Sequence, residues 1–124
     1  GRSVNPMIVH GQQHGAVAQG VGQALMERCV YDPGSGQLLS GSFLDYAIPR
    51  AADLPPISVT SRDVPSPTNP LGVKGAGEGG TVGAPGAVIH AILNALAPLG
   101  VTHLDMPATP ERVWQAIQDA RSGG

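Results

Sequence analysis

Apolar residues recur with the period of a helix in some segments of the chain and with the period of a strand in others. Between residues 14 and 29 the apolar positions are four apart, at Val17, Val21, Leu25 and Cys29. This spacing is typical of an amphipathic helix. Gly20 and Gly22 fall inside it, and each costs about 1 kcal/mol relative to Ala. We therefore expect other atoms to approach the helix closely at these two glycines.

Two further helices are predicted nearer the C-terminus. Residues 85–96 place their apolar side chains on one wide face, and Pro98 and Gly100 follow where such a helix would end. The last helix begins after Thr109, a preferred N-cap residue, with Pro110 at the first helical position.

Four other segments show strand patterns. Residues 57–62 alternate apolar and polar side chains, as a half-buried strand does. Residues 38–48 and 101–104 are also predicted as strands, and residues 4–9 resemble a strand that is entered partway. Together with the helices, they predict an α+β fold with a mixed sheet and two to three packed helices. We expect residues 1–124 to form a single domain that is a fragment of a larger one.

Composition and charge exclude several classes of protein. Gly and Pro supply 18 and 12 of the 124 residues, but 41% of the chain is hydrophobic, so a folded, loop-rich chain is expected. The net charge is −2 and no Lys/Arg cluster is present, which argues against nucleic-acid binding. Apolar runs look too short for a transmembrane segment, and no signal-peptide pattern opens the chain. A cytoplasmic location is therefore expected.

A glycine loop at residues 72–80 carries the candidate chemistry. Its five glycines surround Glu78, the only acid between Val64 and His103, and it leads toward a helix for which Thr81 is a candidate cap. A long turn is the simplest explanation of so many glycines. Backbone N–H groups at the start of a helix can also converge on an anion. A carboxylate in poorly solvated surroundings has a raised pKa and suits a general base.

Two common nucleotide-binding loops do not match this segment. Residues 75–80 fit the spacing G-x-G-x-x-G, but residues 67–70 (Pro-Thr-Asn-Pro) precede them where a strand is needed. No acidic residue stands about 20 positions further on to bind a ribose. Lys74 is followed by Gly75 rather than by Ser or Thr, which excludes a Walker loop. A phosphate or nucleotide binder is therefore the least favoured function.

The segment Asn69-Pro70-Leu71-Gly72-Val73-Lys74-Gly75-Ala76-Gly77-Glu78 resembles the signature of the xanthine dehydrogenase and aldehyde oxidase superfamily. It is most similar to the aerobic carbon monoxide dehydrogenase large-chain group. The resemblance implies that Glu78 is the catalytic base beside molybdenum. It also implies that the residues before Glu78 line the cofactor site, namely Lys74, Gly75, Ala76 and Gly77. For Lys74, an ion pair with an acid is an equal alternative.

A second segment, Val4-Asn5-Pro6-Met7-Ile8-Val9-His10-Gly11-Gln12-Gln13-His14-Gly15, resembles the family segment whose Gln contacts the molybdopterin cofactor. That residue is Gln12 here. Residues 18–25 resemble the family helix whose glycines pack near the pterin, and residues 41–46 and 109–114 continue the match in order. One departure is Ala16, where many relatives have glycine.

The family resemblance implies a segment of a molybdenum hydroxylase large subunit that is inactive alone. Its cofactor would be molybdopterin, in the cytosine dinucleotide form, with molybdenum held by the pterin and by no protein side chain. Iron–sulfur clusters and FAD would belong to partner chains or domains of an oligomer that includes the remainder of the large subunit. The substrate would be CO, an aldehyde or an N-heterocycle, with water as the oxygen source.

The alternative is a non-catalytic, stand-alone remnant of the same fold that acts as a binding or interaction module. The Gly77-Glu78 and Gly11-Gln12 pairs favour the enzyme, because a remnant has no need to keep either. The four histidines lack metal-ligand spacing and are expected to be structural. Cys29 is the single cysteine, which excludes an internal disulfide. Its surroundings do not match the family's copper-binding loop, so the sequence does not establish CO oxidation.

Overall fold

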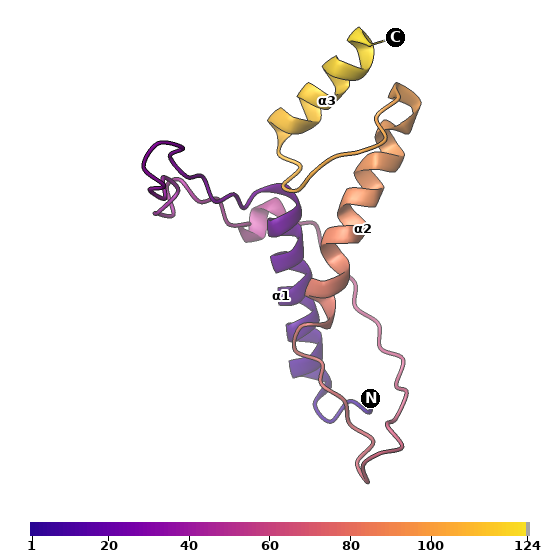
Figure 1. The fold of residues 1–124 in the computed structure, drawn as a ribbon. Helices are drawn as coiled ribbons and strands as arrows, with labels where there is room; N and C mark the ends of the chain where they lie inside the picture. The colour runs from indigo at the N-terminus through magenta and orange to yellow at the C-terminus, as the bar shows by residue number, and fades with distance from the viewer. Residues whose placement is uncertain (124) are drawn as a thin grey trace.

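The computed structural model describes residues 1–123 and contains three α-helices, α1 (Pro6–Leu25), α2 (Gly79–Leu96) and α3 (Pro110–Ser122). Short 3₁₀ turns cover Ala51–Asp53 and Ala97–Leu99. In Figure 1, α1 and the first half of α2 lie side by side and run in the same direction. α3 lies beyond the C-terminal end of α1, and the residues that follow α1 form an arm that projects from the helices.

No β-strand forms within residues 1–123, so the predicted α+β fold with a mixed sheet is wrong. Residues 57–60 keep the predicted alternation of side-chain exposure, whereas Ser61 and Arg62 are both exposed, and no second strand within residues 1–123 lies beside them. Residues 38–48 and 101–104 form turns and irregular structure. Alternation predicts which side chains face a packed surface, whereas a sheet also needs a neighbouring strand at hydrogen-bonding distance.

α1 begins at Pro6, well before its predicted start. The side chain of Asn5 accepts a hydrogen bond from the backbone N–H of Ile8 at 3.2 Å, and Pro6 occupies a first-turn position where its missing N–H costs nothing. Residues 4–9, predicted as a strand, are therefore the cap and first turn of α1. The helix ends before Cys29, which is exposed.

α2 begins at Gly79, within the predicted glycine loop and before the candidate cap Thr81, and it continues through Pro85. Glu78 takes the N-cap position without a side-chain cap bond. Thr81 is not the cap: it lies in the first turn, and its hydroxyl donates to the backbone carbonyl of Ala16 on α1 at 3.1 Å. The helix starts early because its first turn packs against α1.

α3 confirms the predicted last helix. The hydroxyl of Thr109 accepts a hydrogen bond from the backbone N–H of Arg112 at 3.4 Å, and Pro110 is the first helical residue. Just before the helix, the backbone N–H of Ala108 donates to the carbonyl of Ala24 at 2.6 Å. This bond ties the segment leading into α3 to the end of α1.

Small residues allow α1 and α2 to approach closely. A Cβ at Gly20 would lie 2.6 Å from the Cβ of Ala84, and one at Gly80 would lie 2.9 Å from the Cβ of Ala16. Both separations are shorter than carbon atoms accept, so these positions exclude a side chain. At Gly22 a Cβ would lie 2.7 Å from Cδ of Pro49. The close approach expected at both glycines of α1 is confirmed.

The arm after α1 is held at its base by a tyrosine. The Tyr46 hydroxyl donates to a carboxylate oxygen of Glu27 at 2.7 Å. This hydrogen bond, with partial removal from water and the nearby negative charge of Glu27, raises the pKa of Tyr46 to about 12. Further out, an isolated β-bridge joins Tyr31 and Leu38. Tyr46 therefore has a structural role: it ties the arm to the end of the segment that follows α1.

The chain buries few large apolar side chains. Its buried hydrophobic residues are the small Ala16, Ala24, Val101 and Ala108. Large side chains are exposed instead, including Met7 at 79%, Phe43 at 82% and Leu44 at 97%. Surface of this kind, when contiguous, is typical of a segment that packs against further protein.

One segment within residues 1–123, Gly79–Leu99, is long and apolar enough to cross a membrane by length and composition alone. This corrects the expectation that every apolar run is too short. Thr81, His90 and Asn94 look like interruptions in the sequence, but the intervening residues keep the whole segment apolar. A core helix of a larger protein has the same properties.

Candidate cofactor and catalytic site

The structure brings together the two sequence motifs that carry the predicted site. The side-chain amide of Gln12 on α1 donates to the backbone carbonyl of Gly77 at 3.3 Å. Gly77 immediately precedes Glu78, and Thr81 then bonds to Ala16 on the same helix. The glycine loop therefore lies along α1, although about half of the chain separates the two segments in sequence.

Glu78 lies at the junction between the glycine loop and α2, with a φ of −118° and a ψ of 8°. Its side chain is exposed and forms no hydrogen bond or ion pair within residues 1–123. The poorly solvated surroundings expected for a general base are thus not supplied by this segment. Any such surroundings must come from protein or cofactor beyond it.

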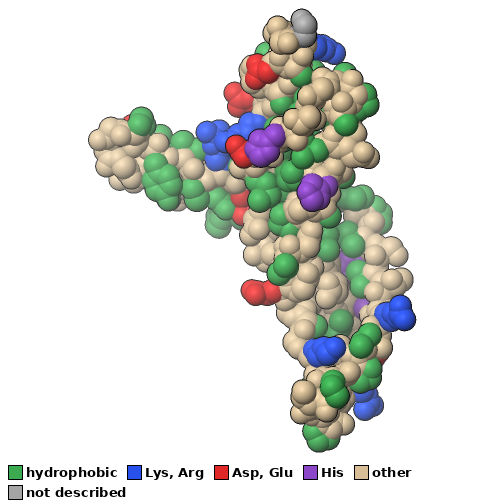
Figure 2. All heavy atoms as spheres, turned by 45° about the vertical axis from the view of Figure 1, so that its right-hand side comes forward, with side chains coloured by type: hydrophobic (Ala, Val, Ile, Leu, Met, Phe, Trp, Pro, Cys, Tyr) green, Lys and Arg blue, Asp and Glu red, His purple; other side chains and the backbone are tan. Residues whose placement is uncertain are grey.

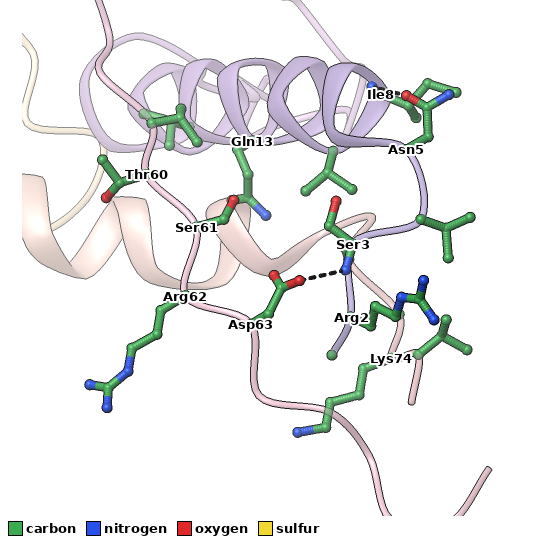
Figure 3. A pocket seen from close by; sticks show the side chains of 18 of the residues that line it. Arg2, Ser3, Asn5, Ile8, Gln13, Thr60, Ser61, Arg62, Asp63 and Lys74 are labelled. Carbon is green, nitrogen blue, oxygen red and sulfur yellow. Dashed lines mark hydrogen bonds between the residues drawn. The ribbon is translucent and has the colours of Figure 1, made fainter. Parts of the chain in front are cut away.

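A groove of about 780 Å³ adjoins the loop and is called here the N-terminal groove. Its walls are residues 1–9 in part, the extended residues 57–63, and residues 73–76 of the glycine loop. Lys74, Gly75 and Ala76, three of the predicted cofactor-binding residues, line it. Gln12 does not; its neighbour Gln13 does, and Figure 3 shows the Gln13 side chain reaching from α1 into the groove.

Three basic residues lie along the N-terminal groove. Arg2, Arg62 and Lys74 line it, against the single carboxylate of Asp63. Asp63 accepts a hydrogen bond from the backbone N–H of Ser3 at 3.1 Å, as Figure 3 shows. Figure 2 shows Lys and Arg side chains at the lower end of the molecule, away from the arm. Lys74 forms no ion pair within residues 1–123, so the predicted pairing with an acid is not seen there.

The turn that precedes the loop is firmly braced. The side chain of Asn69 donates to the carbonyl of Val73 at 3.0 Å and accepts from the N–H of Val73 at 3.1 Å. Gly72 has a φ of +67°, a conformation that favours glycine, and a Cβ there would lie 2.9 Å from the Cβ of Pro65. The backbone of Val73 is therefore fixed in position at the start of the flexible part of the loop.

Three features of the groove, one of which is the positive charge described above, fit a bound group that lies outside the protein chain. The Ser3 hydroxyl oxygen is buried and has no hydrogen-bond partner within residues 1–123. A Cβ at Gly75 would meet nothing within 4 Å, so no contact in this segment accounts for glycine at that position. An unused hydroxyl, free glycine backbone and excess positive charge suit an anionic, hydrogen-bonding group such as a phosphorylated pterin.

Sequence reasoning did not assign Gln13, Ser3 or His14 to these positions. Both ring nitrogens of His14 lie near backbone carbonyls, Nδ1 at 2.7 Å from His10 and Nε2 at 2.9 Å from Ile57. His14 thereby joins α1 to the extended residues of the groove wall, in a structural role. The signal for Gln13 was available, because it stands four residues from both Val9 and Val17, which also line the groove. No group of three His, Cys, Asp or Glu residues within residues 1–123 could hold a metal ion.

Comparisons with known proteins agree with the motifs. A family model described as a molybdopterin cofactor-binding domain matches residues 1–55. The nicotine 6-hydroxylase large subunit of Paenarthrobacter nicotinovorans is 44% identical over 115 residues, which is 93% of this chain and 14% of the relative. The carbon monoxide dehydrogenase large chain of Hydrogenophaga pseudoflava is 38% identical over 119 residues, or 96% of this chain and 15% of the relative.

A solved structure shows the same fold. Quinoline 2-oxidoreductase from Pseudomonas putida 86 matches 96% of this chain with a TM-score of 0.91 and 44% sequence identity, over 15% of its own chain. The sequence thus spans about a seventh of the length of these relatives. It belongs to the xanthine dehydrogenase and aldehyde oxidase superfamily of molybdenum hydroxylases and matches a molybdopterin-binding segment of their large subunits.

Proposed function

We propose that this chain forms one side of the active site of a molybdenum hydroxylase, with Glu78 as its general base. The observation that carries the proposal is the hydrogen bond from Gln12 to Gly77, which joins the two family motifs beside Glu78. Gln12, Lys74, Gly75, Ala76 and Gly77 are the residues that would contact the cofactor. The alternative of a non-catalytic module gives no reason for this arrangement.

The overall reaction adds one oxygen atom from water to a carbon atom of the substrate. The substrate carbon loses two electrons, and two protons are released. When bound, the molybdenum cofactor supplies the electron-accepting chemistry. Iron–sulfur clusters and FAD in partner chains or domains would be the acceptors of these electrons.

Glu78 would accept one of the protons at a carboxylate oxygen as the new carbon–oxygen bond forms. A general base near its target proton contributes typically 10²- to 10⁴-fold to the rate. This role requires partial removal of Glu78 from water, because a fully hydrated carboxylate is a weak base at neutral pH. The exposed carboxylate of this segment would be covered by the remainder of the large subunit and by substrate.

The N-terminal groove would hold the anionic part of the cofactor. Arg2, Arg62 and Lys74 would offset phosphate charge, and the Ser3 hydroxyl and the Gly75 backbone would offer hydrogen bonds. The cytosine dinucleotide form of molybdopterin adds a second phosphate to that of the pterin, and the basic residues of the groove would offset the charge of both.

We propose an N-heterocycle as the substrate class. Nicotine 6-hydroxylase and quinoline 2-oxidoreductase, whose names give N-heterocyclic substrates, are each 44% identical to this chain. The carbon monoxide dehydrogenase large chain is 38% identical. A turnover screen of the complete enzyme with an artificial electron acceptor would compare quinoline and nicotine with CO and an aldehyde.

The test of the catalytic role is Glu78→Gln in the complete enzyme. We expect turnover to fall by about 10²- to 10⁴-fold while the molybdenum content per subunit stays at the wild-type level. Glu111→Gln, at an exposed position in the first turn of α3, is the matched control and should be fully active. Wild-type turnover in Glu78→Gln would refute the assignment. A wild-type complex that binds no molybdenum would favour the non-catalytic module.

A further inference from the structure

The position of Glu78 depends on its backbone neighbours. Its side chain makes no hydrogen bond within residues 1–123, so nothing in this segment holds the carboxylate directly. The peptide on its N-terminal side is held by Gln12, whose amide donates to Gly77 at 3.3 Å. On the C-terminal side, Thr81 donates to Ala16 at 3.1 Å. Glu78 therefore lies between two attachments to the same helix, α1.

Packing at Gly80 limits movement of this segment along α1. A Cβ at Gly80 would lie 2.9 Å from the Cβ of Ala16 and 3.2 Å from the backbone nitrogen of Val17. The first turn of α2 is thus seated against the backbone of α1. Because protein interiors resist changes of even a methylene group, the start of α2 has one favoured position on α1.

Beyond Val73 the loop packs against Gly1 at the backbone of Lys74, and its next attachment is at Gly77. The hydrogen bonds of Asn69 end at Val73. Within residues 1–123, Lys74, Gly75 and Ala76 form no hydrogen bond, and Gly77 forms one, with Gln12. Two glycines in so short a stretch leave it many backbone conformations. Loss of the Gln12 bond would therefore release Gly77 and loosen the N-terminal side of Glu78, while Thr81 and Gly80 still hold its C-terminal side.

We propose that Gln12 and Thr81 are positioning residues that hold the Glu78 carboxylate at its working position from α1. This inference rests on the proposed function, because it takes Glu78 as the reacting group. It adds a second role for Gln12: the amide nitrogen holds the loop, while the amide oxygen, which has no recorded partner in this segment, is left to accept a hydrogen bond from the cofactor.

The two roles of Gln12 give different signals. Loss of a cofactor contact lowers the amount of molybdenum bound per subunit. Loss of positioning lowers kcat per bound molybdenum and leaves the KM for substrate almost unchanged, because a small misplacement of a catalytic group costs rate more than binding. Turnover must therefore be normalised to molybdenum content.

The experiment uses the complete enzyme with four substitutions. Gln12→Met and Thr81→Val remove the two hydrogen bonds at nearly constant volume, and Thr81→Ser keeps the hydroxyl. Gln23→Met is the matched control, at an exposed glutamine on α1 whose side chain forms no hydrogen bond within residues 1–123. We expect kcat per molybdenum to fall about tenfold in Gln12→Met and Thr81→Val. Thr81→Ser and Gln23→Met should keep the wild-type value.

A second measurement does not depend on activity. Hydrogen–deuterium exchange on the complete large subunit without cofactor reports how firmly residues 74–80 are held. Exchange in this segment should be faster in Gln12→Met and Thr81→Val than in the wild type, and unchanged in Gln23→Met. Unchanged exchange, or wild-type kcat per molybdenum in both variants, would overturn the positioning roles.

The double variant with Glu78→Gln separates the inference from the proposed function. If Gln12→Met acts through Glu78, it should lower the residual rate of Glu78→Gln by less than twofold; a full tenfold loss in that background would contradict positioning. A large loss in Glu78→Gln with none in Gln12→Met or Thr81→Val would overturn the positioning roles alone. Full activity in Glu78→Gln would instead remove the proposed function, and with it the carboxylate to be positioned.

Discussion

Gly80 of α2 lies directly against Ala16 of α1, so that a Cβ at position 80 would come within 2.9 Å of the Cβ of Ala16. The contact sits two residues after Glu78 and one helical turn after Gln12. It sets how closely the glycine loop can approach α1. The glycine is therefore required by helix packing, whatever the cofactor contributes at the loop.

Gly80→Ala should destabilise the large subunit by about 1–3 kcal/mol, because the added methyl group overpacks the contact with Ala16. Gly83→Ala is the control. It lies in the same helix, and a Cβ there would meet nothing within 4 Å. Within this segment it should be neutral or stabilising, by up to about 1 kcal/mol. Urea unfolding of the cofactor-free subunit compares the two variants, and equal midpoints would contradict the packing role of Gly80.

The helices were largely predictable, since their signals are local. Thr109 and Pro110 mark the start of α3 whatever surrounds them, and the prediction was right. Asn5 and Pro6 give the same kind of signal for α1, but the apolar residues that follow were interpreted as a strand. The sheet could not be predicted from alternation alone, because residues 57–60 alternate in exposure and still lack a partner strand within residues 1–123.

The site was predictable in its residue types but not in its geometry. The motifs identify Glu78 and Gln12, whereas the hydrogen bond between Gln12 and Gly77 depends on how α1 packs against the loop. Which glutamine faces the groove depends on which side of α1 is turned toward the groove. Because the predicted helix began at residue 14, Gln12 and Gln13 had no assigned face, and the groove contact of Gln13 was missed.

The Tyr46–Glu27 hydrogen bond predicts a loss of stability at high pH. The pKa of Tyr46 is raised from 10.0 to about 12, so the folded chain favours the protonated phenol. The stability gained from this bond is complete below pH 10 and is lost as the pH rises from 10 through 12. Tyr46→Phe should abolish this part of the pH dependence.

The measurement is the difference in unfolding midpoint between the wild type and Tyr46→Phe at pH 8, 10 and 11.5. The difference should shrink at the highest pH, because above pH 10 the phenol ionises in the unfolded chain, whereas the folded chain keeps the proton that Tyr46 donates to Glu27. Tyr31→Phe is the matched control, since Tyr31 is exposed and its hydroxyl forms no hydrogen bond within residues 1–123. A difference for Tyr46→Phe that stays constant across the three pH values would show that the bond contributes nothing to stability.

Gly75→Ala tests whether the loop lines a cofactor. A Cβ at Gly75 meets nothing within 4 Å in this segment, and its backbone does not adopt the left-handed conformation, so the variant should fold normally. A bound pterin phosphate in the N-terminal groove would meet the new methyl group. Molybdenum retention should then weaken by roughly tenfold, as expected for an overpacking cost in the range of about 1–3 kcal/mol.

Two measurements on Gly75→Ala separate an effect on folding from an effect on cofactor binding. The unfolding midpoint of the cofactor-free large subunit should match the wild type, while the molybdenum content per subunit falls after dialysis. Gly86→Ala, which also has open space around its Cβ but lies on α2 away from the groove lining, should change neither. Wild-type molybdenum content in Gly75→Ala would show that the cofactor does not approach the loop at this residue, and Glu78 would then lack the neighbour that its proposed chemistry requires.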